Sequence, residues 1–142
     1  MSIKKVRYKL WDGSDMIISL IKRWEPGSLH SEKEYENSLY HFLCSKLEDF
    51  KITPQFSRDR FKADIVIEDE IIIELKNNLS ATRNYHALIG QLTEYKKWDG
   101  VTIVILLGET DRDLRLRLEQ FIEQEQNEYS FFMDSNFQII HK

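Results

Sequence analysis

The sequence predicts an α/β domain with a mixed central β-sheet flanked by helices. Three observations lead to this class. The chain has 142 residues, of which 42% are hydrophobic and 31% charged, and these values suit one globular domain with its own core. Apolar residues recur at helical spacing in several segments, and apolar runs of strand length lie between them. Runs of helices and strands that follow each other in this way favour a sheet covered by helices.

Two helices are expected first. Residues 15–24 place apolar side chains at helical spacing, and Pro26 with Gly27 ends that pattern. Ser31 and Glu34 have the spacing of a capping box, in which Ser31 caps the second helix and Glu34 bonds back to the Ser31 amide. The second helix carries one apolar stripe, made of Tyr35, Leu39, Phe42, Leu43 and Leu47.

Strands and helices follow in the rest of the chain. Gly100 precedes a strongly apolar strand, and Thr110 with Asp113 is expected to cap the helix after it. The expected elements are strand 52–56, a hairpin from about 61 to 76, helix 84–98, strand 101–107, a helix to about 126, and strands 130–133 and 137–140. The expected order is therefore α-α-β-β-β-α-β-α-β-β.

These elements are expected to form a single domain over residues 1–142. Its core lies at about 31–108, with the helix at 15–24 before it and a helix and short strands at 111–140 after it. We find no internal repeat and no flexible linker.

The chain carries no signal for a membrane or for export. The longest apolar run is far too short to span a bilayer, and the N-terminus has no signal-peptide core. A single cysteine, Cys44, excludes an internal disulfide, and its place in an amphipathic helix predicts a packing role. We expect a cytoplasmic protein with no membrane partner.

The net charge of −4 argues at first against a nucleic-acid partner. An active site made of acids lowers the total charge by itself, so the clustering of positive charge is more informative. The basic clusters are Lys4, Lys5, Arg7 and Lys9, then Arg58, Arg60 and Lys62, then Arg112, Arg115 and Arg117. The first and third are also typical of solvated surface, whereas the middle one leads directly into the hairpin.

Strand alternation divides the hairpin into two faces. One face is apolar throughout and consists of Ala63, Ile65, Ile67, Ile71, Ile73 and Leu75. The other consists of Lys62, Asp64, Val66, Ile72, Glu74 and Lys76. A turn centred on Asp69 closes the apolar face, with Ile65 opposite Ile73, and a slip by one residue would misalign the faces.

The same register places Asp64 opposite Glu74, and two opposed carboxylates repel each other. Lys76 supplies part of the positive charge that they need, and a hard divalent cation such as Mg²⁺ would supply the rest. Lys76 is then placed to orient an attacking water and to neutralise developing charge. The spacing alone fits a solvated hairpin face with ion pairs equally well.

These residues resemble a known family. Asp64, followed after nine residues by Glu74-Leu75-Lys76 at the end of an apolar strand, is similar to the signature of the PD-(D/E)xK nuclease superfamily, which has the restriction-endonuclease-like fold. Ala63 stands where the family has a proline, at a position that tolerates variation. The resemblance covers about residues 32–107, in the αβββαβ core order of that fold.

Two helices add to the resemblance. Gln91 and Tyr95 resemble the Q-x-x-x-Y element of the exonuclease and recombination-nuclease branch, and four-residue spacing puts them on one helix face. The less favoured alternative is that they are helix surface and core rim. Glu36 resembles the acid that the first helix of the family directs at the metal, and Glu32 competes with it for that role.

The resemblance implies a hydrolytic nuclease that uses Mg²⁺ or Mn²⁺ to cleave DNA, with RNA as another possible substrate. The implied metal ligands are Asp64, Glu74, the Leu75 carbonyl and Glu36. Lys76 would act on the water, Gln91 and Tyr95 would position the substrate phosphate or the catalytic groups, and Arg58, Arg60 and Lys62 would contact the DNA backbone. A homodimer would supply a second site. A non-catalytic nucleic-acid-binding or assembly subunit on the same fold, or an interaction protein with no nucleic-acid role, remains an alternative.

Overall fold

The computed structural model describes residues 10–59, 61–97, 100–129 and 137–142. Its elements are α1 (Leu10–Arg23), α2 (Glu32–Lys46), β1 (Ile52–Arg58), β2 (Phe61–Ile67), β3 (Ile71–Asn77), α3 (Thr82–Tyr95), β4 (Val101–Leu107), α4 (Arg112–Tyr129) and β5 (Phe137–His141). This is the expected order, except that the strand predicted at 130–133 lies outside the described residues.

The strands form one mixed five-stranded sheet in the order β1-β2-β3-β4-β5. The first three strands are antiparallel to one another, and β4 and β5 are each parallel to the strand before them. Parallel neighbours need a long crossover, and α3 and α4 supply it. The predicted α/β class with a mixed sheet flanked by helices is therefore confirmed.

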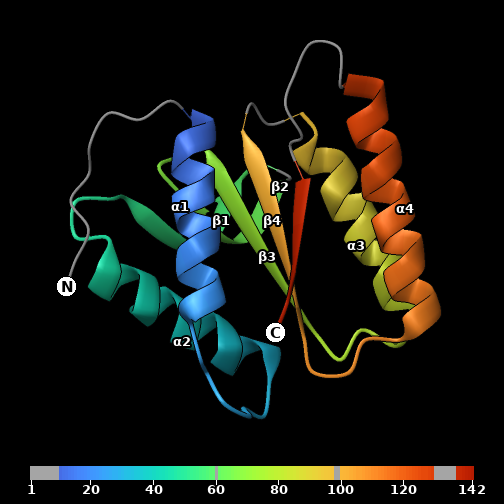
Figure 1. Ribbon diagram of the computed structural model, residues 1–142, viewed down its shortest axis with the longest axis horizontal. Coiled ribbons are helices and arrows are strands. Elements are labelled where there is room, and N and C mark those ends of the chain that lie inside the picture. The colour runs from blue at the N-terminus through green and yellow to red at the C-terminus, as the bar shows by residue number, and fades with distance from the viewer. Residues whose placement is uncertain (1–9, 60, 98–99, 130–136) are drawn as a thin grey trace.

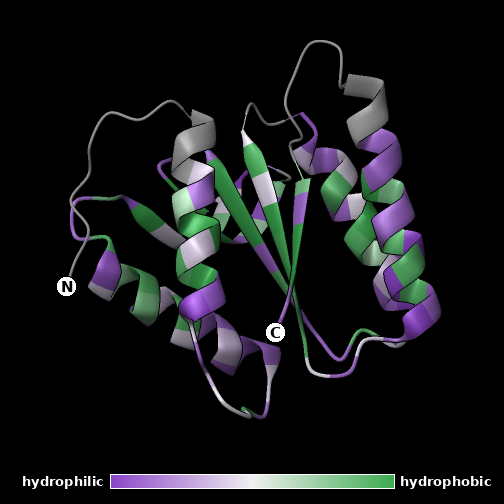
Figure 2. Cartoon of the chain, in the orientation of Figure 1, coloured by the Kyte–Doolittle hydropathy of each residue, from purple (hydrophilic) through white to green (hydrophobic). Residues whose placement is uncertain are grey.

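Helices cover both faces of the sheet (Figure 1). α1 and α2 pack on one face, and α3 and α4 pack on the other, so two apolar clusters share the sheet between them. β4 is buried along its whole length, as a strand covered on both faces should be. The hydropathy colouring shows the same arrangement, with the central strands mostly apolar (Figure 2).

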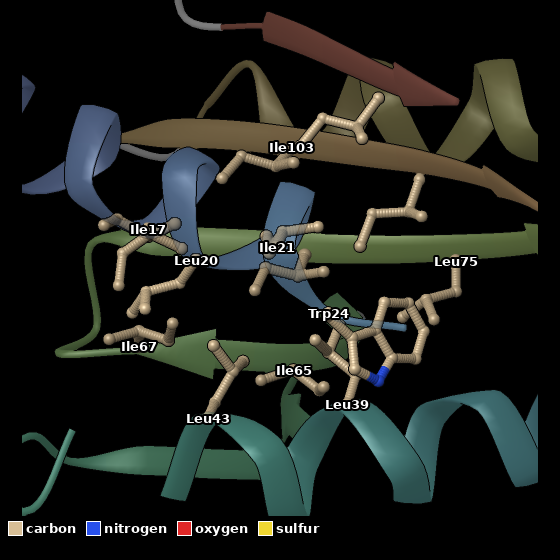
Figure 3. Close-up of a cluster of buried hydrophobic side chains, with 14 of the residues drawn as sticks. Ile17, Leu20, Ile21, Trp24, Leu39, Leu43, Ile65, Ile67, Leu75 and Ile103 are labelled. Atoms are coloured by element: carbon tan, nitrogen blue, oxygen red, sulfur yellow. The ribbon is translucent and has the colours of Figure 1, made fainter. Parts of the chain in front are cut away.

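The first cluster is built where α1 and α2 meet the sheet (Figure 3). Ile17, Ile21 and Leu39 are fully buried there against Ile65 and other strand residues. The rim of the same cluster is fixed by a hydrogen bond, which the Trp24 indole N–H donates to Ser38 Oγ at 3.1 Å. This bond joins the residue that follows α1 to the middle of α2, over the same face of the sheet.

The residues that cap the helices agree in part with those predicted from the sequence. The Glu34 amide donates to Ser31 Oγ at 3.2 Å, which confirms Ser31 as the cap. The Glu34 carboxylate, however, accepts from the His30 amide at 2.7 Å rather than from Ser31. α4 is capped by Asp111, whose Oδ2 accepts from the Leu114 amide at 3.1 Å, and not by Thr110.

Three further expectations differ from the structure. α1 extends earlier than 15–24, α3 is Thr82–Tyr95 rather than 84–98, and α4 runs on to Tyr129. Cys44 is exposed, because it lies on the face of α2 that points away from the apolar stripe, so its predicted packing role is wrong. Over the described ranges, no helix is long and apolar enough to cross a bilayer.

Candidate active site

The candidate site lies where β2 and β3 separate. The register between them pairs Ile65 with Ile73 and Ile67 with Ile71, as predicted. The paired residues end there, and Asp64 Oδ2 instead accepts a hydrogen bond from the Leu75 amide at 2.8 Å. The Asp64 carboxylate therefore bonds a main-chain group of the neighbouring strand. The pairing was predicted to continue with Asp64 opposite Glu74, but β2 and β3 pair only from Ile65 to Ile67 and from Ile71 to Ile73.

An irregular position in β1 accompanies this separation. Gln55 has a φ of +49°, and the pairing of β1 with β2 skips from Pro54–Ile65 to Phe56–Ala63. Ala63 and Phe56 pack in the cluster beneath α3 and α4, whereas Ile65 packs beneath α1 and α2. The prediction that Ala63 shares the apolar face of Ile65 is wrong, because the regular alternation of the side chains breaks between them.

Glu74 is the most deeply buried acid of the site, with only 1% of its surface exposed. Its carboxylate lies 2.7 Å from the Tyr95 hydroxyl and accepts from Gln91 Nε2 at 3.3 Å. The Lys76 ammonium is 3.7 Å from Glu74 Oε1. The structure thus brings together Glu74, Lys76, Gln91 and Tyr95, four residues that the sequence predicted for the site, and both helix residues hold Glu74 directly.

The Tyr95 hydroxyl has two oxygen neighbours and a single proton. It lies 2.7 Å from Glu74 Oε2 and 2.6 Å from the Lys62 carbonyl. A hydroxyl can donate to only one of them. The two oxygens therefore compete for the Tyr95 proton, and Glu74 and the Lys62 carbonyl are held close to the same hydroxyl.

Two acids of α2 complete the cluster. Glu32, Glu36 and Asp64 each offer a carboxylate oxygen, and these oxygens lie within 4.8 Å of one another. Glu36 accepts a hydrogen bond from the Gln55 side chain, and Glu32 Oε2 accepts from the Asn77 amide at 3.1 Å. The sequence left Glu36 and Glu32 as competitors, and the structure places both beside Asp64.

Burial raises the pKa of three carboxyl groups of the site, those of Glu74, Glu36 and Asp64. For Glu74, burial and then the charge of Asp64 raise the pKa to about 8, although Tyr95 and Lys76 oppose the shift. For Glu36, burial and then Asp64 raise the pKa to about 7. Burial also raises the pKa of Asp64, against the Leu75 N–H bond that lowers it. The ionised forms of these three groups are therefore disfavoured unless further positive charge compensates them.

The donor set fits a hard divalent cation. Mg²⁺ and Mn²⁺ prefer oxygen ligands, and Mg²⁺ is commonly bound through one or two carboxylates with water and phosphate in the remaining positions. Asp64, Glu36 and Glu32 converge on one point, and Glu74 adjoins Asp64. Leu75 contributes its amide to Asp64, while a role for its carbonyl stays a prediction.

The middle basic cluster lies at the ends of β1 and β2. Lys62 is exposed and lines a pocket of about 430 Å³ beside Asp64. The Arg58 guanidinium lies 5.4 Å from the centre of the Phe56 ring. Arg60, the third residue predicted to contact DNA, lies outside the described residues, as does the basic segment at 4–9. The contacts of these side chains with DNA stay predictions.

Sequence reasoning missed two residues of the site. Gln55 bonds Glu36 from β1, and the Asn77 amide anchors Glu32 after β3. Neither carries a recognisable signal, because a single polar residue in a strand is compatible with many surroundings. A positive φ at Gln55 is also unexpected for a residue within a strand.

No protein-family model, curated protein or solved structure matches this chain.

Proposed function

We propose that this protein is a metal-dependent nuclease that hydrolyses DNA phosphodiester bonds with Mg²⁺ or Mn²⁺. The observation that carries the proposal is the buried Glu74, with the half-buried Asp64 and the Lys76 ammonium beside it at one point of the sheet. Burying several carboxylates costs free energy unless a cation or proton compensates them. A protein gains from such an arrangement when the compensating cation takes part in its function.

Each residue has a proposed role. Asp64, Glu74 and the acids of α2 would hold a divalent cation, which would polarise the phosphate and lower the pKa of a water molecule. Lys76 neutralises the negative charge that develops on the phosphate and orients the attacking water. Gln91 and Tyr95 hold the Glu74 carboxylate in the orientation that the cation requires.

We further propose that the fold is restriction-endonuclease-like and that the chain is a PD-(D/E)xK nuclease. The support is the order α2-β1-β2-β3-α3-β4, which matches the αβββαβ core expected for that fold. Asp64 lies on β2, and Glu74 and Lys76 lie at the end of the adjacent β3. The alternative of a non-catalytic DNA-binding subunit is less favoured, because a cluster of carboxylates without a cation repels phosphate and weakens DNA binding.

Nicking of a supercoiled plasmid tests this proposal. The wild-type protein should nick the plasmid with Mn²⁺ and leave it intact with a chelator. Asp64→Asn should abolish nicking, because it removes a metal ligand while keeping the size of the side chain. Asp69→Asn is the matched control, since Asp69 is a partly exposed acid in the turn of the same hairpin, where it pairs with Lys51. A wild-type protein that never nicks DNA, or an Asp64→Asn variant that nicks at the normal rate, would contradict the proposal.

A further inference from the structure

One segment beside the carboxylate cluster contains no acidic residue. The protein as a whole is acidic, with 24 acidic and 20 basic residues, yet no aspartate or glutamate occurs between Glu74 and Glu94. The same segment contains Lys76, Arg83 and His86 and forms the end of β3 and most of α3. Charge is therefore unevenly distributed along the chain, and the clustering of charge, rather than its total, indicates where a charged partner binds.

This segment reaches the rim of the candidate site. A pocket of about 230 Å³ is lined by Glu32, which belongs to the carboxylate cluster, and by Lys76, Asn84 and Ala87. Arg83 directly precedes Asn84 on α3 and is exposed. The outer turns of α3 thus continue from the rim of the pocket onto the surface of the molecule.

A second arginine joins this surface from α4, which lies beside α3 on the same face of the sheet (Figure 1). The exposed Arg117 has its guanidinium 4.6 Å from the centre of the Tyr85 ring, two residues after Arg83 on α3. Asp113 has the spacing from Arg117 that a helical ion pair needs, but these two residues, both of which the structure describes, form no ion pair. The stack covers one face of the guanidinium, so the N–H groups along its edge can still donate hydrogen bonds.

The exposed part of α3 suits a phosphate backbone better than an apolar partner. Ala87 and Gly90 are exposed and small, and a Cβ built at Gly90 would have no atom within 4 Å, so a backbone can approach the helix closely. Leu116 is the one exposed large apolar residue among those that the structure describes, and it belongs to α4. Protein interfaces usually have an apolar or aromatic core, which the exposed residues of α3 do not offer. Arginine, in contrast, is a common donor to the phosphate oxygens of DNA.

We infer that Arg83 and Arg117, with the exposed face of α3 from Arg83 to Gly90, form a docking surface for the DNA backbone outside the active site. DNA as the partner rests on the nuclease function proposed above. The two arginines donate to phosphate oxygens and read no base. Lys62 lines the other pocket of the carboxylate cluster, together with Asp64. The DNA therefore meets cations on both sides of the carboxylates, and α3 and α4 hold the part of the backbone that extends beyond the site.

Fluorescence anisotropy of labelled single-stranded and duplex DNA in Ca²⁺ tests the docking surface. Arg83→Gln and Arg117→Gln should each weaken binding by about 5- to 10-fold at about 0.1 M salt, and each should reduce the slope of log affinity against log salt by about one. The loss should be the same for DNA of different base sequences. Arg83→Lys and Arg117→Lys keep the charge and should retain most of the affinity. Arg23→Gln is the matched control and should bind as the wild type does, because it removes the same charge from an exposed residue at the end of α1, on the opposite face of the sheet (Figure 1).

The outcomes separate the docking surface from the nuclease function. A folded Arg83→Gln/Arg117→Gln variant with wild-type affinity and salt slope, in a protein that nicks plasmid DNA, would overturn the docking surface and leave the nuclease function standing. Arginine-dependent DNA binding by a wild type that never nicks DNA would support the docking surface and overturn the nuclease function. A wild type that binds neither form of DNA would contradict both. A glutamate-rich peptide that binds the wild type but not the double variant, with DNA binding equal in the two proteins, would identify a protein partner and overturn the inference.

Discussion

At the scale of single residues, the site contains carboxylic acids whose raised pKa values favour the protonated form in the metal-free protein. Glu74 has a pKa of about 8 and Glu36 of about 7, against an ordinary value of 4.5 for both, mainly because they are buried. The folded state therefore keeps protons that the unfolded chain has already released. The resulting stabilisation is complete below about pH 4.5 and is lost as the pH rises through about 8.

The metal-free protein should accordingly have a larger free energy of unfolding at about pH 5.5 than at about pH 8.5. Denaturant titration at both values measures the difference. Glu74→Gln should reduce this pH dependence, because an amide does not titrate but still bonds Tyr95. Mn²⁺ should stabilise the wild type more at the higher pH, where the ligands are free of protons. A metal-free wild type that is as stable at the higher pH as at the lower one would contradict this account.

At the scale of elements, the active-site end of the sheet depends on the turn after β4. Gly108 has a φ of +69°, and a Cβ added there would lie 2.2 Å from Asn78 Oδ1. That oxygen accepts from the Glu109 amide at 2.9 Å, and the Asn78 amide donates to the Leu107 carbonyl at 2.9 Å. The turn therefore ties the end of β3, directly after Lys76, to the end of β4.

Gly108→Ala should lower the free energy of unfolding by about 2 kcal/mol or more, since it combines a left-handed backbone with a clash against Asn78. Gly90→Ala is the matched control. Gly90 lies in α3 with no atom within 4 Å of an added Cβ, so the substitution should raise stability by about 0.5–1 kcal/mol. Chemical denaturation of both variants makes the comparison. Equal effects of the two substitutions would show that the turn does not constrain the sheet.

At the scale of the whole molecule, the element order and the hairpin register could be predicted because local signals and burial agree. The alternating isoleucines of β2 and β3 allow only one register that closes the core, and the structure has it. The capping residue Ser31 was predictable for the same reason, since its signal is local. The order of the strands in the sheet is harder to predict from the sequence, because it depends on which face of the sheet each crossover helix covers.

The details of the site could not be predicted in the same way. Regular alternation fails between Ala63 and Ile65, at the level of the sheet where Gln55 of the neighbouring β1 has a positive φ, and neither irregularity has a recognisable signal in the sequence. The four-residue spacing of Gln91 and Tyr95 predicted a shared helix face, but not that both side chains hold Glu74. The choice between Glu32 and Glu36 depended on the packing of α2, which places both near Asp64.

The measurement that tests the central claim most directly is single-turnover DNA cleavage by Lys76→Ala. Lys76 contacts Glu74 at 3.7 Å, and its proposed action is on charge that develops during the reaction. The variant should cleave about 100- to 1,000-fold more slowly, while its affinity for DNA in Ca²⁺ should change little. Lys62→Ala should show the opposite pattern, a salt-dependent loss of affinity with a nearly normal chemical step at saturating protein. A folded Lys76→Ala variant that cleaves at the wild-type rate would contradict the mechanism assigned to this site.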